Sequence, residues 1–333
     1  MLERLLKSHL LFKITEPNLP AYRFHLKMIR FIGGRAISLI IILFCVVTAT
    51  FFLIRIMPGG PFDRERKLSP NIEKQLLKKY KLDGPILDQY FNYLGDLLHG
   101  DLRLSTKYRN RSVNEILADS LPVSVTLGSI AFCIATFAGV LLGSVAAANQ
   151  HGWIDRTAMF GALLAISLPS FVIGPMLVLL FAINFPLLPV GGWGDFRSLI
   201  LPALTLAAPY AAYIARLTRA SMLEVLSQDY IRTARAKGLN EIQVIYKHGL
   251  RVAILPVISF LGPLAANLLT GSIVVENIFN IPGAGGFFVS SVLNRDGFLL
   301  AGVVIVYCTL LVGFNLVVDI LYGFLDPRIL LYD

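Results

Sequence analysis

Six long runs of apolar residues dominate the pattern of this chain. Each approaches or exceeds the roughly 20 apolar residues that cross a bilayer as a helix. The runs cover residues 36–54, 121–148, 157–184, 198–215, 252–275 and 297–318. Because hydrocarbon offers no partner for backbone N–H and C=O groups, and no period-2 alternation suggests a barrel, each run is predicted to be helical. We therefore expect an all-α, polytopic membrane protein with six transmembrane helices.

The composition agrees with a membrane protein. The 333 residues are 56% apolar and only 15% charged, against roughly 25% charged in a typical soluble domain. The first run begins too late and is too long for a cleaved signal peptide, so we interpret it as a retained helix. Cys45, Cys133 and Cys308 fall within predicted spans, where we expect buried thiols that pack as small apolar groups. The five histidines are scattered without a His-Glu-x-x-His motif, so no metal site is predicted.

The net charge of +9 is distributed as expected for membrane topology rather than for nucleic-acid binding. Lysine and arginine in short loops mark the cytoplasmic side of a membrane protein. Residues 1–35 and 216–251 carry seven of these cations each, whereas the connections 185–197 and 276–296 carry one each. Six helices with both termini in the cytoplasm satisfy this pattern.

Residues 58–119 then form a long external loop between the first two helices. Its eleven lysines and arginines are nearly balanced by nine acidic residues, and long loops translocate largely regardless of charge. "MPGGPF" ends the first span through Pro58 and two glycines. Beyond it, "NIEKQLLKKYKL" and "LDQYFNYLGDLL" carry leucines and aromatic residues at helical spacing, which predicts two short external helices.

Residues 1–30 are interpreted as a basic cytoplasmic leader, followed by one membrane domain at 31–333. The leucines of "LERLLKSHLL" share one helical face, while Arg4 and Lys7 lie elsewhere. This pattern is typical of a helix lying in the membrane interface. A basic tail without fixed structure is the alternative.

The predicted spans contain almost no ionisable side chain, although ion coupling inside a membrane normally requires one. Glu276, in "VVENIF", is the best candidate. It either touches a substrate or gate, or it pairs with a neighbouring helix or reaches the interface. No Gly-x-x-x-x-Gly-Lys-Ser/Thr phosphate-binding loop occurs in the chain. If the protein pumps a solute, another subunit must hydrolyse the nucleotide, so we expect neither enzymatic activity nor a cofactor in this chain.

The cytoplasmic segment 216–253 is long, basic and patterned as helices. "SMLEVLSQDYIRTARAKG" has apolar residues three and four positions apart, which predicts a helix. Gly238 follows Lys237 at its end, as in a helix that terminates in the left-handed conformation with cations in its last turn. "NEIQVIYKHGL" is predicted to begin a second helix capped by Asn240. A basic anchor on anionic lipid is the alternative, but lipid attraction does not require two helices joined by a turn.

This segment resembles the coupling loop of ABC importer permeases. The general signature of that family is Glu-Ala-Ala-x-x-x-Gly followed by Ile-x-Leu-Pro, and it is poorly kept here, because Arg232, Thr233 and Ala234 occupy its first three positions. The peptide-importing branch instead reads "RTARAKGL", then His-x-Leu-Arg/Lys and Leu-Pro, as at 248–251 and 255–256. Further similarities along nearly the whole chain are "MPGGPF", "QYFNYLGDLLHGDL", "SLPSFVIGP", "ARLTRASMLEVL", "TGSIVVENIFNIPGAGG", "LNRD" and "FLDPR". The chain resembles the first permease subunits of oligopeptide importers.

Two features depart from the pattern of these permeases. Arg103 follows "GDL" where the family has glycine, and the basic leader is longer than usual. The first departure bears on how the external loop meets its partner. Neither lies in the loop at 216–253.

The resemblance implies both a fold and a set of partners. The fold is the bundle of a type I ABC importer permease. The partners are a second homologous permease, two cytoplasmic ATPase subunits that bind ATP and Mg, and an extracytoplasmic peptide-binding protein, in the inner membrane of a bacterium. The residues implied to couple to the ATPase are Thr233, Ala234, Arg235, Ala236, Lys237 and Gly238. We expect Ala234 and Gly238 to fit the ATPase groove because they are small, with Arg235 and Lys237 at its rim.

A second candidate region is the broken external segment "GSIVVENIFNIPGAGG". Pro282 and the glycines from Gly283 onward interrupt helical structure, so Glu276, Pro282 and Gly283 are candidates for a gate or path; an ordinary turn is the alternative. Three other functions stay open: a permease for dipeptides or nickel in the same family, an ATP-independent secondary transporter or channel, and a noncatalytic membrane scaffold.

Overall fold

The described part of the chain is built from helices. The computed structural model describes residues 19–56, 70–108 and 110–325, and within them the only strand-like pairing is one isolated bridge between Leu104 and Ser112. The all-α prediction is confirmed. In chain order the helices are α2 (Leu19–Ile56), α3 (Pro70–Lys79), α4 (Ile86–Leu98), α5 (Val113–Ala148), α6 (Trp153–Ser167), α7 (Ser170–Val178), the π-helix η1 (Leu179–Asn184), α8 (Phe196–Leu226), α9 (Asp229–Ala236), the π-helix η2 (Gln243–Gly249), α10 (Leu250–Ala253), α11 (Leu255–Leu269), α12 (Ile273–Ile278), α13 (Ala284–Leu293) and α14 (Gly297–Leu325).

All six predicted runs lie in apolar helices, but two of them are bent. Four helical stretches are long and apolar enough to cross a membrane alone, namely Ile32–Ile56, Val113–Ala148, Phe196–Leu226 and Gly297–Val318. Two further pairs qualify together: Trp153–Ser167 with Ser170–Asn184 bends by 111°, and Gln243–Ala253 with Leu255–Leu269 bends by 54°. The described residues therefore offer six spans if each bent pair counts as one.

Proline accounts for both bends. Leu168 precedes Pro169 and is extended, with φ −88° and ψ 123°, because the proline ring disfavours helical backbone in the residue before it. α7 starts directly afterwards. Pro256 occupies the first turn of α11, where its missing N–H is tolerated at a helix start but not within a continuing helix. The sequence predicted runs of sufficient length, but the continuous helices it implied at 157–184 and 252–275 are broken.

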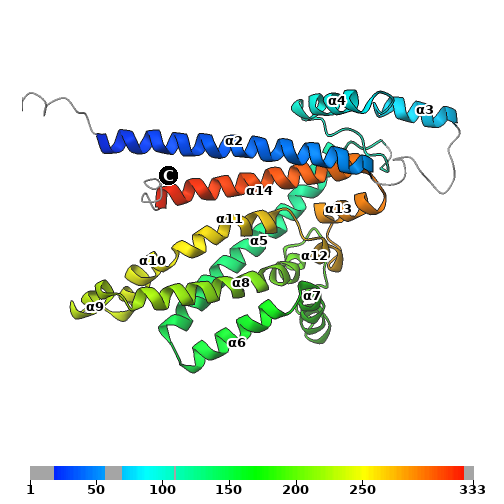
Figure 1. The fold of residues 1–333 in the computed structure, drawn as a ribbon. Coiled ribbons are helices and arrows are strands. Elements are labelled where there is room, and N and C mark those ends of the chain that lie inside the picture. The colour runs from blue at the N-terminus through cyan, green and yellow to red at the C-terminus, as the bar shows by residue number, and fades with distance from the viewer. Residues whose placement is uncertain (1–18, 57–69, 109, 326–333) are drawn as a thin grey trace, which may run out of the picture.

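The centre of the bundle is the close contact between α5 and α8 (Figure 1). A Cβ atom on Gly139 of α5 would lie 2.6 Å from Cβ of Ile214 on α8, so only glycine permits this approach. Around it, buried side chains of α5, α8, α11 and α12 form the largest apolar core of the described chain. The small residues of "FAGVLLGSVAAA" thus permit this close helix packing.

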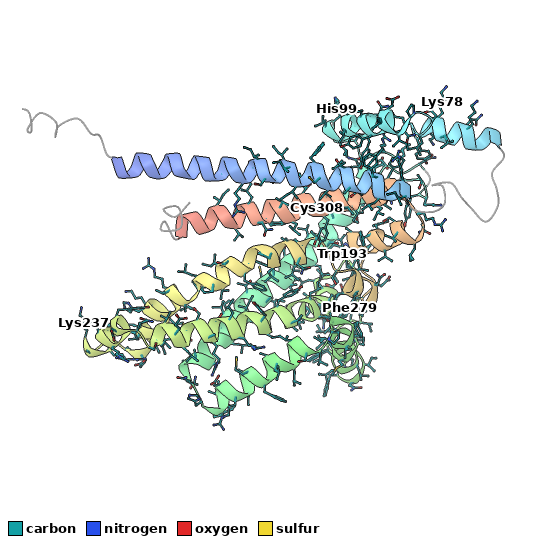
Figure 2. All side chains as sticks on the ribbon, in the orientation of Figure 1. Lys78, His99, Trp193, Lys237, Phe279 and Cys308 are labelled. Atoms are coloured by element: carbon teal, nitrogen blue, oxygen red, sulfur yellow. The ribbon has the colours of Figure 1, made fainter. Side chains whose placement is uncertain are left out.

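The functional regions lie at opposite ends of this bundle. In Figure 1 the first turns of α2, the last turns of α14 and the loop containing α9 share one end, at the left. Helices α3, α12 and α13 lie at the other end, and Figure 2 shows Lys237 and Phe279 far apart in the same way. The start of α2, the end of α14 and the loop at 216–253 therefore lie at one end of the described chain.

The external segment contains the two helices that were predicted, α3 and α4. Helix α5 begins at Val113, earlier than the apolar run that starts at residue 121. Ser112 caps that helix: its hydroxyl accepts from the Glu115 N–H while the Glu115 carboxylate accepts from the Ser112 N–H. Residues 58–69 lie outside the described part.

Helix α4 packs along the outer third of α2. The hydroxyls of Thr48 and Tyr90 are hydrogen-bonded at 2.7 Å, and the rings of Phe51 and Tyr93 stack with centroids 5.6 Å apart. The helix therefore lies beside the span rather than apart from it (Figure 1).

Two further predictions meet different outcomes. Of the predicted leader at residues 1–30, residues 1–18 lie outside the described residues, and residues from Leu19 onward belong to α2. The expectation of buried thiols is wrong for Cys45 and Cys133, which are exposed on this chain, while Cys308 is half-buried on α14. These positions face membrane or another subunit rather than the core of this chain.

Candidate functional sites at the two ends of the bundle

The loop at 216–253 consists of two short helical arms rather than the single long first helix predicted for "SMLEVLSQDYIRTARAKG". Helix α8 continues to Leu226, beyond the predicted end of its span, and α9 begins at Asp229. Between them Gln228 is extended, with φ −72° and ψ 152°, and the Ser227 hydroxyl donates to the Glu224 carbonyl. Such a serine bond competes with helix continuation.

The two arms enclose a small apolar core of their own. Ile231 of α9 and Val244 of η2 are fully buried, and Ala234 and Leu226 pack against them. At the base of the loop, Met222 is buried among Ala147, Val225 and Ala253. The loop is therefore a compact body attached to the end of α8.

Gly238 forms the turn between the arms in the left-handed conformation that was predicted, with φ +78°. Its N–H donates to the Arg235 carbonyl at 2.9 Å. The predicted cap at Asn240 is also confirmed, because its side-chain oxygen accepts from the Ile242 N–H at 3.1 Å. No atom of the described chain lies within 4 Å of where a Cβ on Gly238 would stand. The outside of the turn is open to a partner.

Of the residues predicted to contact an ATPase, Ala234 does not fit the expectation that it enters the ATPase groove, because it is buried. Ala234 is buried against Val244 inside the loop, so its small size serves the loop's own packing. Arg235 forms an ion pair with Glu241 across the turn, with Nε 2.7 Å from Oε1. The predicted positions that are exposed are Thr233, Arg235, Ala236, Lys237 and Gly238.

Several exposed apolar side chains of the loop were missed by the sequence reading. Among them, Tyr230 lies at the start of α9, Leu239 and Ile242 follow Gly238, and Ile242 is 65% exposed. The sequence shows these apolar residues beside the cations. Whether their side chains point outward depends on the burial of Ile231 and Val244 in the loop, which local spacing alone does not predict. Together with Lys237, they form an amphipathic outer surface.

An ion pair connects the base of this loop to the rest of the bundle. Arg219 of α8 donates from Nε and Nη2 to the Asp155 carboxylate at the start of α6, at 2.5 and 2.7 Å. Asp155 also accepts from the His151 N–H and is only 3% exposed. This bidentate pair ties the start of α6 to α8 near the beginning of the loop at 216–253.

At the opposite end, Glu276 lies on the short helix α12 and is 1% exposed. Its Oε1 accepts from the Ser124 hydroxyl of α5 at 2.7 Å, and its Oε2 accepts from the Gly285 N–H of α13 at 3.0 Å. Ser124 in turn accepts from the Ala284 N–H at 2.8 Å. Glu276 was predicted either to touch a substrate or gate, or to pair with a neighbouring helix or reach the interface. These hydrogen bonds show that it pairs with neighbouring helices. Burial raises the pKa of the Glu276 carboxyl above its ordinary value, an effect that the bonds from Ser124 and Gly285 partly offset.

Glycine makes room for this carboxylate. A Cβ on Gly283 would overlap the Glu276 carboxyl group, and one on Gly285 would lie 2.8 Å from its Oε2. Pro282 is exposed at the tip between α12 and α13. The predicted gate residues Glu276, Pro282 and Gly283 therefore belong to one tight hairpin, which we call the α12–α13 hairpin (Ile273–Leu293).

The 185–195 connection closes over this hairpin. The Gly192 N–H donates to the Phe279 carbonyl at 2.8 Å, and Phe279 is 1% exposed. Figure 2 shows Trp193 and Phe279 at this same end. In this conformation Glu276 is sealed inside the protein and does not line an open passage.

Two family patterns match the chain, and together they cover most of it. The pattern described as "Binding-protein-dependent transport system inner membrane component" matches residues 139–331, which include the loop at 216–253 and the α12–α13 hairpin. The corresponding N-terminal component matches residues 28–128. The chain belongs to this family of inner membrane transport components. It is accordingly a multi-pass permease subunit of an ABC transporter, and in such transporters ATP hydrolysis takes place on separate subunits.

Relatives of this permease extend over nearly its whole length. It is 45% identical over 304 residues to the oligopeptide transport system permease protein of Haemophilus influenzae, covering 91% of this chain and 99% of that one. It is 43% identical over 305 residues to the dipeptide transport system permease protein of Bacillus subtilis, covering 92% and 99%. Permeases of this family act with a partner permease, ATPase subunits and a substrate-binding protein.

A solved structure supports the fold. A chain of the MetNI methionine ABC transporter, in inward facing conformations, aligns with a TM-score of 0.50 at 15% identity, covering 63% of this permease and 96% of that chain. The predicted type I importer bundle is confirmed at this level.

Proposed function

We propose that this chain is the membrane-spanning permease subunit of an ATP-driven oligopeptide importer. The observation that carries the proposal is the 45% identity to oligopeptide permeases over 91% of the chain. The family pattern that matches residues 139–331 includes the loop at 216–253 and the α12–α13 hairpin.

The proposed complex contains this permease, a second homologous permease, two cytoplasmic ATPase subunits with ATP and Mg, and an extracytoplasmic peptide-binding protein. Both termini and the loop at 216–253 are on the cytoplasmic side in this arrangement. The seven cations in each of the segments 1–35 and 216–251 support that orientation.

The loop at 216–253 acts as the mechanical link to the ATPase. Its own core, built on Ile231 and Val244, allows it to move as a rigid body, and such rigid-body movement is how two helical bundles can rock between inward- and outward-facing states. Exposed Lys237 and Ile242 and the open side of Gly238 supply the docking surface. The Asp155–Arg219 pair passes the movement on to α6.

At the other end, the α12–α13 hairpin serves as part of a gate facing the delivery protein. Glu276 holds this hairpin closed on α5, and Pro282 marks its exposed tip. For this gate to open, the hydrogen bonds of Glu276 must either move together with the hairpin or break.

A dipeptide importer is the second candidate. It is favoured by one observation, the 43% identity to the dipeptide permease of Bacillus subtilis, which falls only two percentage points below the value for the oligopeptide permeases.

The test is copurification of the tagged chain from its native membrane, with partners identified by mass, followed by uptake into vesicles that contain the purified complex. We expect a second permease and ATPases to copurify, and uptake of peptides longer than two residues to stop with vanadate. Uptake limited to dipeptides selects the second candidate. Uptake by the isolated chain without ATPases contradicts both.

A further inference from the structure

A cavity of about 270 Å³ lies between the outer ends of α2 and α14 and the external helices α3 and α4. Three aromatic rings, those of Phe51, Tyr93 and Phe298, stand in its wall beside aliphatic side chains. Two cations stand in that wall: Arg55, one residue before the end of α2, and Arg295. The cavity thus combines an apolar interior with guanidinium groups.

Asp296, which lines this cavity, and Asp96, which is paired with Arg103, are both already engaged in hydrogen bonds. Asp296 accepts from the Ser105 hydroxyl and from the N–H groups of Thr106, Lys107 and Leu299. Asp96 accepts from Lys81 at 3.0 Å and from Arg103 Nε at 2.8 Å. Although burial raises the pKa of Asp96, the hydrogen bonds from Lys81 and Arg103 outweigh it and bring that pKa below its ordinary value.

The cations, in contrast, are incompletely paired. Arg103 is 7% exposed, yet its Nη1 and Nη2 have no hydrogen-bond partner among the described residues. Its guanidinium lies 5.3 Å from the ring centroids of both Tyr93 and Phe298, behind the cavity wall. It also has φ +69°, a conformation that favours glycine and explains why glycine was expected here. Burying a cation with unpaired donors, on a backbone in this conformation, costs free energy.

Arg55 faces the cavity from the other side. Its guanidinium stacks on Phe51, 3.7 Å from the ring centroid, and Nη2 donates to the Gln89 side chain. Burial raises the pKa of the Tyr93 phenol to about 12, and both Arg103 and Arg55 oppose that rise. Tyr93 therefore lies within the field of two arginines, and the space beside it attracts an anion.

The surface around this cavity is apolar on both flanking helices. On α2, Leu53 and Ile56 are 62% and 76% exposed, and on α4, Leu87, Phe91 and Leu98 are 63%, 65% and 88% exposed. Ring contacts from Phe52 to Tyr90 and from Tyr90 to Phe91, each with centroids 5.6 Å apart, make the two surfaces continuous. Large apolar side chains at the outer end of a transmembrane helix face hydrocarbon.

We propose that this cavity binds an outer-leaflet phospholipid, with its phosphate at Arg55 and its acyl chains against α2 and the apolar face of α4. Arginine is the side chain best suited to a phosphate because it presents two parallel donors. Arg103 is a positioning residue that adds positive potential from behind Tyr93 and Phe298. Assignment to the outer leaflet rests on the orientation given under the proposed function.

A transported peptide fits this cavity less well. The cavity lies on α2 and α14, which are packed side by side, whereas the central core of the bundle is formed by α5, α8, α11 and α12 (Figure 1). The cavity therefore lies to one side of the central core.

The first test measures phospholipid retained by the intact, detergent-purified complex, by native mass spectrometry. Arg55→Gln is expected to retain about tenfold less phospholipid, as for loss of one charge-assisted pair, and Arg55→Lys an intermediate amount. Arg111→Gln is the matched control, because Arg111 is an exposed external arginine paired with Asp119 and away from the cavity. Equal retention by Arg55→Gln and Arg111→Gln overturns the proposal.

A second measurement covers the case in which Arg55→Gln does not assemble. The delipidated complex is titrated with short-chain phosphatidylglycerol, inorganic phosphate or a short peptide, and its melting temperature is followed. We expect the lipid alone to raise the melting temperature in wild type, with a weaker rise in Arg55→Lys. An equal rise with inorganic phosphate or peptide, or an undiminished rise with lipid in Arg55→Lys, contradicts a phospholipid site.

Discussion

The two ends of this permease are built on opposite plans. The loop at 216–253 has a core of a few apolar side chains and an exposed surface of cations and apolar groups around Gly238. The α12–α13 hairpin instead encloses a carboxylate that is bonded to two other helices and surrounded by glycine. One end is a surface for a partner, and the other is a closed internal joint.

This difference predicts which substitutions each end of the permease tolerates. Substitutions on the outer surface of the loop leave the fold of this chain intact and act through the partner, since nothing in the described chain packs against Gly238 there. Substitutions around Glu276 act on the fold itself, because a buried polar group that loses its partners costs free energy. The predictions that follow test this difference, beginning with the largest expected effect.

Gly283→Ala is expected to destabilise the purified complex the most. The added Cβ overlaps the Glu276 carboxyl, so overpacking of about 1–3 kcal/mol adds to the loss of buried hydrogen bonds. Thermal melting and the yield of assembled complex measure it. Gly286→Ala is the matched control, because nothing lies within 4 Å of a Cβ at Gly286. A Gly283→Ala complex as stable as Gly286→Ala means that Glu276 is not held as described.

Asp155→Asn is expected to have the next largest effect, at the base of the loop. Removing one partner of a buried ion pair costs about 3–5 kcal/mol, and the cost here is smaller because the Arg219 side chain is 24% exposed. Uptake per ATP hydrolysed should also fall, because α6 no longer follows α8. Arg156→Gln, at the exposed neighbouring position, should change neither quantity. Unchanged stability and unchanged coupling in Asp155→Asn argue against this link.

The smallest effect is a pH dependence of the hairpin. Because burial raises the pKa of Glu276, its contribution to stability is complete below the unfolded pKa of about 4.3 and is lost as pH rises through the raised folded value. The stability gap between wild type and Glu276→Gln should therefore narrow as pH increases. Melting of both complexes across a pH series measures the gap. A gap that stays constant or widens would exclude a raised pKa.

Local signals in the sequence predicted much of the loop and little of the hairpin. The left-handed Gly238 and the cap at Asn240 depend on neighbours within a few residues, and both were found as predicted. The bond between Ser124 and Glu276 joins residues 152 positions apart, which no local spacing encodes. The burial of the Ala234 side chain is likewise set by packing between α9 and η2, where it meets Val244.

Length and apolarity predicted the spans but not their bends. Pro169 and Pro256 were visible in the sequence, yet proline also occurs within the continuous helices α5 and α8, at Pro122 and Pro202. Tertiary packing decides which of these prolines interrupts a helix. Arg103 could be recognised as a departure from the family pattern, but its place between two aromatic rings could not.

The most direct test of the coupling loop compares Gly238→Val with Gly238→Asn in the purified complex in vesicles, with uptake and ATP hydrolysis measured together. A β-branched residue is strained at φ +78° by about 1–2 kcal/mol and projects into the open side of the turn, whereas asparagine tolerates this backbone. We predict that Gly238→Val assembles but transports far less peptide per ATP than wild type, with Gly238→Asn closer to wild type. Normal uptake per ATP in Gly238→Val would contradict the account.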